Sequence, residues 1–256
     1  RTAGIEISSL FGAQYFDYAK PVSLISKLIS LCTCADDIVL DFFSGSATTA
    51  HAVMQLNMEE IGNGGGDANR KFIMVQLPEQ TDAKSEAYKA GYKTICEIGE
   101  ERIRRAGKKI KEESPLTTAD LDIGFRVFKV DSSNMEDVYY RPADYNQGQM
   151  ELFADNIKPD RTPEDLLFQV MLDLGILLSS DIQETEIVGK KVFSVADGYL
   201  IACFDKDVTE ETVKAIAQKQ PVYAVFRDSS MASDSVATNF EQIFETYSPR
   251  TQRKVL

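Results

Sequence analysis

The stretch IVLDFFSGSATTAHAV, residues Ile38–Val53, decides the fold. Its apolar start, Ile38–Phe42, has the length of a short buried strand, and Asp41 lies where that strand ends. Small residues follow, and from about Ala47 to Met58 the apolar residues return at helical spacing. A tight loop between a strand and a helix exposes backbone N–H groups, and the helix dipole favours negative charge there. Such a loop could receive a pyrophosphate or the carboxylate of an amino-acid-like cofactor.

The flanking segments predict an α/β fold. Pro21–Cys32 has nearly helical apolar spacing, and KFIMVQL, Lys71–Leu77, predicts a second strand that is buried on both faces. Strand, helix and strand in this order, with continuous apolar strands, are typical of a parallel sheet. A further helix is expected from about Tyr92 to Glu112, and a further strand over Gly124–Asp131.

The C-terminal part predicts a second, smaller domain. Thr162 and Pro163 are typical of a helix start, strands are expected at Ile187–Val195 and Tyr199–Phe204, and Asp197-Gly198 predicts the turn between them. A helix over 209–218, a strand over 221–226 and a helix over 234–246 complete a ββαβα unit. We therefore predict domains at residues 1–131 and 161–256, joined by a polar segment, 132–160, at the boundary.

Composition narrows the class of protein. The net charge of −12 argues against a surface built as a whole to bind nucleic acid, although local basic contacts stay possible. Four scattered cysteines and one histidine, His51, predict reduced thiols in a cytoplasmic protein and no metal site. Neither a membrane span nor a signal peptide is expected. The first residue is Arg1, so we expect a piece of a longer protein.

Several ligand classes are disfavoured by missing patterns. Gly45 stands alone, so the G-x-G-x-x-G pattern of dinucleotide sites is absent, as is the phosphate loop that ends in Gly-Lys-Ser/Thr. A nicotinamide-dependent oxidoreductase is further disfavoured because no catalytic His or Tyr arrangement is present. A purely structural strand–turn–helix without a ligand also remains open.

The basic run Arg102–Lys111 alternates with acidic residues, which favours a solvated, salt-bridged helix over contact with DNA.

The segment Asp41–Thr49, DFFSGSATT, resembles the D-x-F-x-G-S-G-T-T signature of amino-methylating DNA methyltransferases, which binds S-adenosylmethionine. Ala47 stands where the family often has glycine, which is tolerable if this residue has a negative φ at the helix start. Lys20-Pro21 is similar to the family's K-P-x-x-L segment. Its place about twenty residues before the loop is the order of the β class, whose catalytic block comes first.

The second strand gives a third similarity. Family members end this strand with an acid that accepts hydrogen bonds from the ribose, and the aligned position is Gln76, with Glu79 three residues later. Of the two, we favour Gln76. GYKTICEIGEERIRRAGKKI, LDIGFRVFKVDSSN and VFRDSSMASD resemble C-terminal stretches of the modification subunits of type III restriction-modification systems.

The resemblance implies a Rossmann-like parallel-sheet half of an S-adenosylmethionine-dependent methyltransferase plus a small C-terminal α+β domain. It implies site-specific methylation of a flipped adenine at N6, with DNA, a second methyltransferase subunit and a restriction subunit as partners. The implied cofactor-binding residues are Lys20, Pro21, Asp41, Phe42, Phe43, Ser44, Gly45, Ser46, Thr48, Thr49, Gln76 and Glu79.

The family's catalytic tetrad, D-P-P-Y or a close relative, is missing, because the sequence contains no Pro-Pro. In the β order the tetrad would precede Arg1, so we expect a C-terminal fragment that is inactive alone. The alternative is a non-catalytic module for cofactor binding and subunit assembly, in which residues from about 160 onward make subunit contacts.

Overall fold

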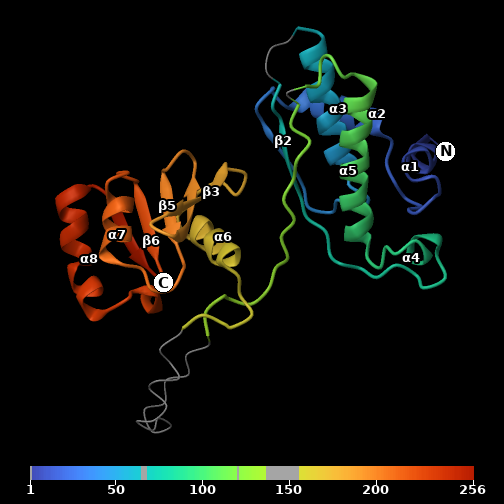
Figure 1. Cartoon of the computed structure of the whole chain (residues 1–256). Helices are drawn as coiled ribbons and strands as arrows, with labels where there is room; N and C mark the ends of the chain where they lie inside the picture. Colours follow the sequence, from blue (N-terminus) through green and yellow to red (C-terminus); the bar gives the residue numbers. More distant parts are fainter. Residues whose placement is uncertain (1, 65–67, 120, 137–155) are drawn as a thin grey trace. The chain divides into compact units, whose positions relative to one another are not determined.

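Figure 1 shows the computed structural model of the chain, which describes residues 2–64, 68–119, 121–136 and 156–256. The chain divides into two compact units, Arg1–Arg126 and Val127–Leu256. The first unit consists, in chain order, of α1 (Thr2–Phe11), α2 (Val22–Cys32), β1 (Ile38–Asp41), α3 (Thr48–Gly62), β2 (Lys71–Met74), α4 (Glu86–Lys89) and α5 (Ile95–Glu113).

Strands β1 and β2 form a two-stranded parallel sheet, in which Ile38 pairs with Lys71 and Asp41 with Met74. The expected strand–helix–strand unit is therefore confirmed, with α3 as the crossover helix. Val39 and Phe72 pack against α2 and α3, and Phe72 and Met74 also contact the cluster between α3 and α5. This face of the sheet positions the loop after β1 against α5.

The opposite face of the sheet is open within the described residues. Leu40 and Ile73, which are paired across the strands, are 58% and 51% exposed. The prediction of a second strand buried on both faces is therefore wrong, because none of the described helices of the first unit covers that side. The apolar composition of the strand is nevertheless that of a buried one.

Local side chains fix the ends of the helices in the first unit. Thr94 and Glu97 form a reciprocal capping box at the start of α5, which satisfies two N–H groups that the helix leaves open. Glu6 of α1 accepts a hydrogen bond from the Val22 N–H at 3.0 Å, which places an acid at the N-terminus of α2. Both helices begin within three residues of their predicted starts.

Residues 121–130 contain no strand, so the prediction of a strand over Gly124–Asp131 is wrong. Phe125 instead packs against the α3–α5 cluster, and Val127 and Phe128 are half exposed. Among the described residues, this segment takes part in no strand or β-bridge. In the sequence, Phe125 and Val127 alternate but Phe128 and Val130 are one position out of phase, as expected for a segment without a single buried face.

The second unit is a mixed five-stranded sheet with helices on both faces. Its elements are α6 (Pro163–Asp173), β3 (Ile182–Ile187), β4 (Lys190–Val195), β5 (Leu200–Cys203), α7 (Glu210–Ala217), β6 (Tyr223–Phe226), the 3-10 turn η3 (Asp228–Ser230), α8 (Asp234–Tyr247) and β7 (Gln252–Val255). The strand order is β3-β4-β5-β6-β7, antiparallel from β3 to β5 and parallel from β5 to β7. One core cluster joins the sheet to α6 and the other joins it to α7 and α8.

The predicted ββαβα unit is correct in part. The start of α6, the turn at Asp197-Gly198, and α7, β6 and α8 are confirmed. The strand predicted over Ile187–Val195 is confirmed over Lys190–Val195 and is wrong at its start, because Val188 and Gly189 have positive φ and turn the chain into a β3–β4 hairpin. Strand β7 was not predicted, since its short polar sequence lies at a sheet edge.

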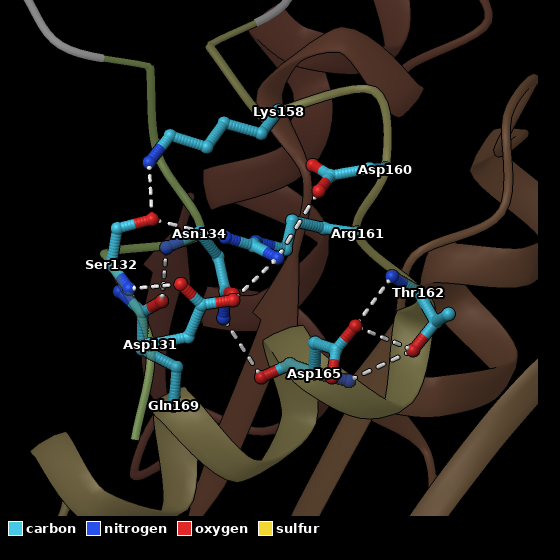
Figure 2. Close-up of polar contacts among 9 residues, drawn as sticks. All are labelled: Asp131, Ser132, Asn134, Lys158, Asp160, Arg161, Thr162, Asp165 and Gln169. Atoms are coloured by element: carbon cyan, nitrogen blue, oxygen red, sulfur yellow. Dashed lines mark hydrogen bonds and ion pairs between the residues drawn. The ribbon is translucent and has the colours of Figure 1, made fainter. Parts of the chain in front are cut away.

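The described ends of the predicted boundary segment, 132–160, are bound to each other, and residues 137–155 lie outside the described residues. Met135 pairs with Ile157, and the Glu136 and Lys158 N–H groups donate to Asn156 and Asn134. Figure 2 shows the polar cluster beside them, in which the Arg161 guanidinium contacts Asp131, Asp160 and Ser132. The two ends therefore join the second unit close to α6.

Two further sequence expectations concern cysteines and membrane spans. All four cysteines are free thiols, with Cys203 buried and Cys32 and Cys34 exposed. Across the described ranges, no helix combines the length and the apolar character needed to cross a bilayer.

Candidate functional site

Asp41 connects the end of β1 to the start of α3. Its carboxylate accepts a hydrogen bond from the buried Thr49 hydroxyl at 2.5 Å and another from the Phe43 N–H at 3.2 Å. The strand ladder continues one step further, because the Val75 N–H donates to the Asp41 carbonyl and the Ser44 N–H to the Val75 carbonyl. The loop is thus tied at both ends to structure formed by β1, β2 and α3.

Gly45 lies at the tip of this loop with a φ of 51°, in the left-handed region that glycine adopts without strain. Its N–H donates to the Gln76 side-chain carbonyl at 2.7 Å. A Cβ at this position would lie 3.3 Å from Cζ of Phe16, so a side chain here would have to displace that ring. Glycine is needed at position 45 for both its backbone angle and its lack of bulk.

Ala47 also has a positive φ, 56°, at the N-cap position of α3. The expectation of a negative φ at this residue is therefore wrong, because the loop turns through the left-handed region before the helix begins. Alanine is accommodated because its Cβ is buried in the cluster between α3 and α5. The methyl contact offsets part of the strain, which is of order 1–2 kcal/mol.

The N-terminus of α3 has no side-chain cap, because Ala47 carries no hydrogen-bonding oxygen. Ser46, Thr48 and Thr49 around it are buried. A buried helix end without capping partners is unusual, because its first N–H groups require acceptors. The backbone N–H groups at such a helix end carry partial positive charge, which suits a negatively charged group.

Helix α5 packs against the Asp41–Thr49 loop. At Gly99 an added Cβ would lie 3.4 Å from the Gly45 carbonyl oxygen and 3.5 Å from the Ala47 Cβ, so helix and loop pack closely. One turn further, Nη1 of Arg102 donates to the Thr48 hydroxyl at 2.7 Å and to the Ser46 hydroxyl at 2.9 Å. Burial lowers the pKa of Arg102 to about 10, which leaves it charged at neutral pH.

Arg102 is the residue that sequence reasoning missed, because it had been assigned to the exposed basic run. Its spacing held the signal: it lies four residues after Ile98 and four before Ala106, on the buried face of α5. Four other members of the run form ion pairs within the helix, as predicted. Arg104 and Arg105 pair with Glu100 and Glu101, and Lys108 and Lys109 lie near Glu112 and Glu113.

His51 lies one turn into α3, and its Nδ1 atom is buried without a hydrogen-bond partner. Burial, followed by the charges of Arg102 and Lys109, lowers its pKa to about 4. The imidazole is therefore neutral at physiological pH. The side chain as a whole is partly buried.

The remaining sequence-derived residues surround the loop less closely. Phe42 and Phe43 are exposed, with ring centroids 5.1 Å apart, and Glu79 is exposed after β2. Lys20 is exposed and Pro21 is the N-cap of α2. The structure thus brings the residues of the Asp41–Thr49 loop together with Gln76. It records no contact between Lys20 and that loop.

Comparison with known proteins identifies relatives of this chain. Residues 3–107 match the family model described as DNA methylase, a span that contains both the loop and Arg102. The Mod subunit of the type III restriction-modification enzyme EcoP15I from Escherichia coli is 34% identical over 251 residues, which is 94% of this chain and 34% of that protein. The chain is a relative of the type III Mod subunits. The resemblance predicted from its motifs is confirmed.

Two more type III Mod subunits show how far the similarity extends. The EcoPI Mod subunit of Escherichia phage P1 is 34% identical over 85% of this chain, and the StyLTI Mod subunit of Salmonella typhimurium is 45% identical over 48% of it. These matches span 32% and 18% of the two relatives. The chain thus corresponds to at most about a third of the length of any of these Mod subunits.

Proposed function

We propose that the loop Asp41–Thr49 binds S-adenosylmethionine and that the chain serves an adenine-N6 DNA methyltransferase of the type III Mod kind. The observation that carries this proposal is the geometry of the loop within a DNA methylase match. Gly45 has a positive φ and no side chain, and the start of α3, which has no side-chain cap, is buried close to it in the sequence. The relatives' names supply the type III assignment.

The residues present fit this cofactor. The uncapped N–H groups of α3 suit the carboxylate of its methionine part, and Gly45 leaves room for a ligand to approach the backbone. When bound, S-adenosylmethionine supplies an electrophilic methyl group. The role of Asp41 and Thr49 is to fix the loop, because each already forms a hydrogen bond with the other.

Gln76 and Glu79 are the two candidates for the ribose. The Gln76 side-chain carbonyl already accepts the Gly45 N–H, and its Nε2 donates to the Leu77 carbonyl. The Glu79 carboxylate is exposed and accepts the ribose hydroxyls more strongly than an amide can. We therefore propose that Gln76 shapes the loop and that Glu79 holds the ribose.

We also propose that β1 and β2 are part of a larger Rossmann-like sheet in the Mod subunit. The paired apolar residues on the open face, among them Leu40 and Ile73, suit a sheet that is covered on both sides. In the complete enzyme a flipped adenine would receive the methyl group directly at N6. Since these 256 residues lack a Pro-Pro tetrad, the chain alone should bind cofactor without methylating DNA.

Isothermal titration calorimetry of the full chain with S-adenosylmethionine tests the site. We expect Gly45→Asp to abolish binding, because its side chain meets Phe16 and adds a negative charge beside Asp41. Gly91→Asp is the matched control, since Gly91 also has a positive φ but has open space around it. Equal binding by the wild type and Gly45→Asp would remove the loop from the cofactor site.

The same titration separates the roles of Gln76 and Glu79. We expect Glu79→Ala to weaken binding about tenfold without lowering thermal stability, because its carboxylate forms no internal bond in the structure described. Gln76→Ala should weaken binding and also destabilise the loop, since it removes the acceptor of the Gly45 N–H. If Glu79→Ala binds S-adenosylmethionine with unchanged affinity, the ribose-binding role would be assigned to Gln76 instead.

A second function is proposed for residues 127–256, which would make protein contacts within the restriction-modification complex. This unit holds 22 acidic and 13 basic residues, a formal charge of −9, which opposes contact with DNA phosphates. We expect no retardation of duplex DNA in a gel by the chain at low salt. Retardation that Lys190→Glu and Lys191→Glu relieve would assign DNA contact to this unit instead.

A further inference from the structure

Arg102 is a buried cation without an ion-pair partner among the described residues. Its side chain is 0% exposed, and both Nε and Nη2 are buried with no hydrogen-bond partner. Only Nη1 is engaged, on the oxygens of Ser46 and Thr48. The acid that acts on it most is Glu6, whose carboxylate accepts the Val22 N–H and forms no ion pair with Arg102.

The helix end beside this cation adds partial positive charge, and the acids Glu6 and Asp41 are engaged by other donors. Arg102 contacts Thr48, the first residue of α3, where the helix dipole places partial positive charge and no side chain caps the N–H groups. His51, the nearby titratable group on α3, is neutral and adds no negative charge. A buried charge that lacks an ion pair and leaves two nitrogen atoms unpartnered is costly, so this part of the molecule favours a bound anion.

We propose that Arg102 is a positioning residue that makes the loop selective for a cofactor with a carboxylate. Through Nη1 it fixes Ser46 and Thr48, and its charge adds to the positive end of α3 where the carboxylate would lie. The proposal rests on the proposed cofactor site but assigns a role that the loop motif does not contain. It explains why a buried arginine with two unpaired nitrogen atoms lies at the N-terminus of α3, which has no side-chain cap.

Two commercially available ligands separate this role from general binding. S-Adenosylhomocysteine carries the α-carboxylate, whereas 5′-methylthioadenosine has the same adenosine and thioether groups without the amino-acid part. We expect the wild-type chain to bind S-adenosylhomocysteine at least about tenfold more tightly by calorimetry, because only this ligand places an anion near the buried cation. Equal affinities for the two ligands would overturn the inference without any variant.

Arg102→Met tests the residue itself, with Arg104→Met as the matched control on the exposed face of α5. We expect Arg102→Met to weaken S-adenosylhomocysteine binding about tenfold and 5′-methylthioadenosine binding by less than about threefold. Arg104→Met should change neither, because Arg104 is half exposed and its contacts are with Glu100 and Glu101 of its own helix and with the Phe125 ring. An equal loss for both ligands would reduce Arg102 to a merely structural residue and contradict the inference.

Arg102→Lys retains the charge but not the guanidinium geometry. We expect it to keep the preference for S-adenosylhomocysteine while both affinities fall slightly, because a single ammonium cannot reproduce the fixed contacts to both hydroxyls. If Arg102→Met does not fold, this variant and the wild-type ratio decide the question. A wild-type chain that binds neither ligand would instead refute the proposed cofactor site, and the inference with it.

Discussion

Ala47 adopts a left-handed backbone conformation that favours glycine, and its methyl group is nevertheless buried. Ala47→Gly should therefore change the free energy of unfolding by less than about 1 kcal/mol. Relief of about 1–2 kcal/mol of strain offsets about 0.8 kcal/mol for the lost methyl burial and the greater entropy of glycine in the unfolded chain.

Ala50→Gly is the control, three residues further along in the regular part of α3 and fully buried. Here no strain is relieved, so we expect destabilisation of about 2 kcal/mol from helix propensity and lost burial. Urea unfolding followed by circular dichroism measures both variants. Equal destabilisation by the two glycines would contradict a left-handed conformation at Ala47.

At the residue level, the loop could be predicted because its chemistry is local. Asp41, Gly45 and Thr49 form a recognisable series in the sequence, and the structure brings Asp41 and Thr49 into direct contact. Gln76 and Arg102 reach the same loop from 31 and 56 residues away. Their contacts depend on how β2 and α5 pack, which sequence periodicity does not specify.

The sheet of the first unit differs sharply between its two faces. Phe72 packs against α2 and α3, whereas its neighbour Ile73 is about half exposed. We expect Phe72→Ala to cost about 2 kcal/mol or more in urea unfolding, and Ile73→Thr to change stability by less than about 0.5 kcal/mol. A large loss for Ile73→Thr would show that this face is covered in the chain itself.

A pH-dependent contact holds α6 to β4. A hydrogen bond from the Lys191 ammonium lowers the pKa of Glu164 at the start of α6. Because the folded pKa is depressed, the contact contributes stability above the ordinary pKa of a glutamate, and that contribution is lost as pH falls through the folded pKa. Its size is small, since both side chains are partly exposed.

Lys191→Met should raise the pKa of Glu164 towards its ordinary value, as measured by NMR titration of the carboxylate carbon. Lys190→Met is the matched control, because Lys190 donates to the Lys206 carbonyl and not to Glu164. A shift of equal size in both variants would indicate a general field effect of positive charge on β4, and would contradict a specific hydrogen bond.

At the element level, strongly patterned helices were predicted and weak strands were not. The cap at Thr162 and the apolar stripe of α5 are readable within a few residues. The β3–β4 hairpin and β7 depend on partners elsewhere in the sheet and on a positive φ at Val188, which a β-branched residue rarely adopts. These strands form because of their pairing with other strands of the sheet, which local sequence patterns do not show.

For the whole molecule, the core clusters of the described residues each lie within one unit. Three of them belong to the first unit, and two cover the faces of the sheet in the second. A domain with its own core can fold by itself, so the cofactor site should depend only on the first unit. The predicted linker 132–160 and the domain limits remain predictions.

The central claim, a cofactor site formed by the Asp41–Thr49 loop, is tested most directly by NMR. The ¹⁵N-labelled chain would be titrated with S-adenosylhomocysteine, and amide signals followed residue by residue. We expect the signals of Gly45, Ser46, Thr48 and Glu79 to shift, while those of residues 163–256 stay unchanged. No shifts at the loop, or shifts confined to residues 163–256, would contradict the claim.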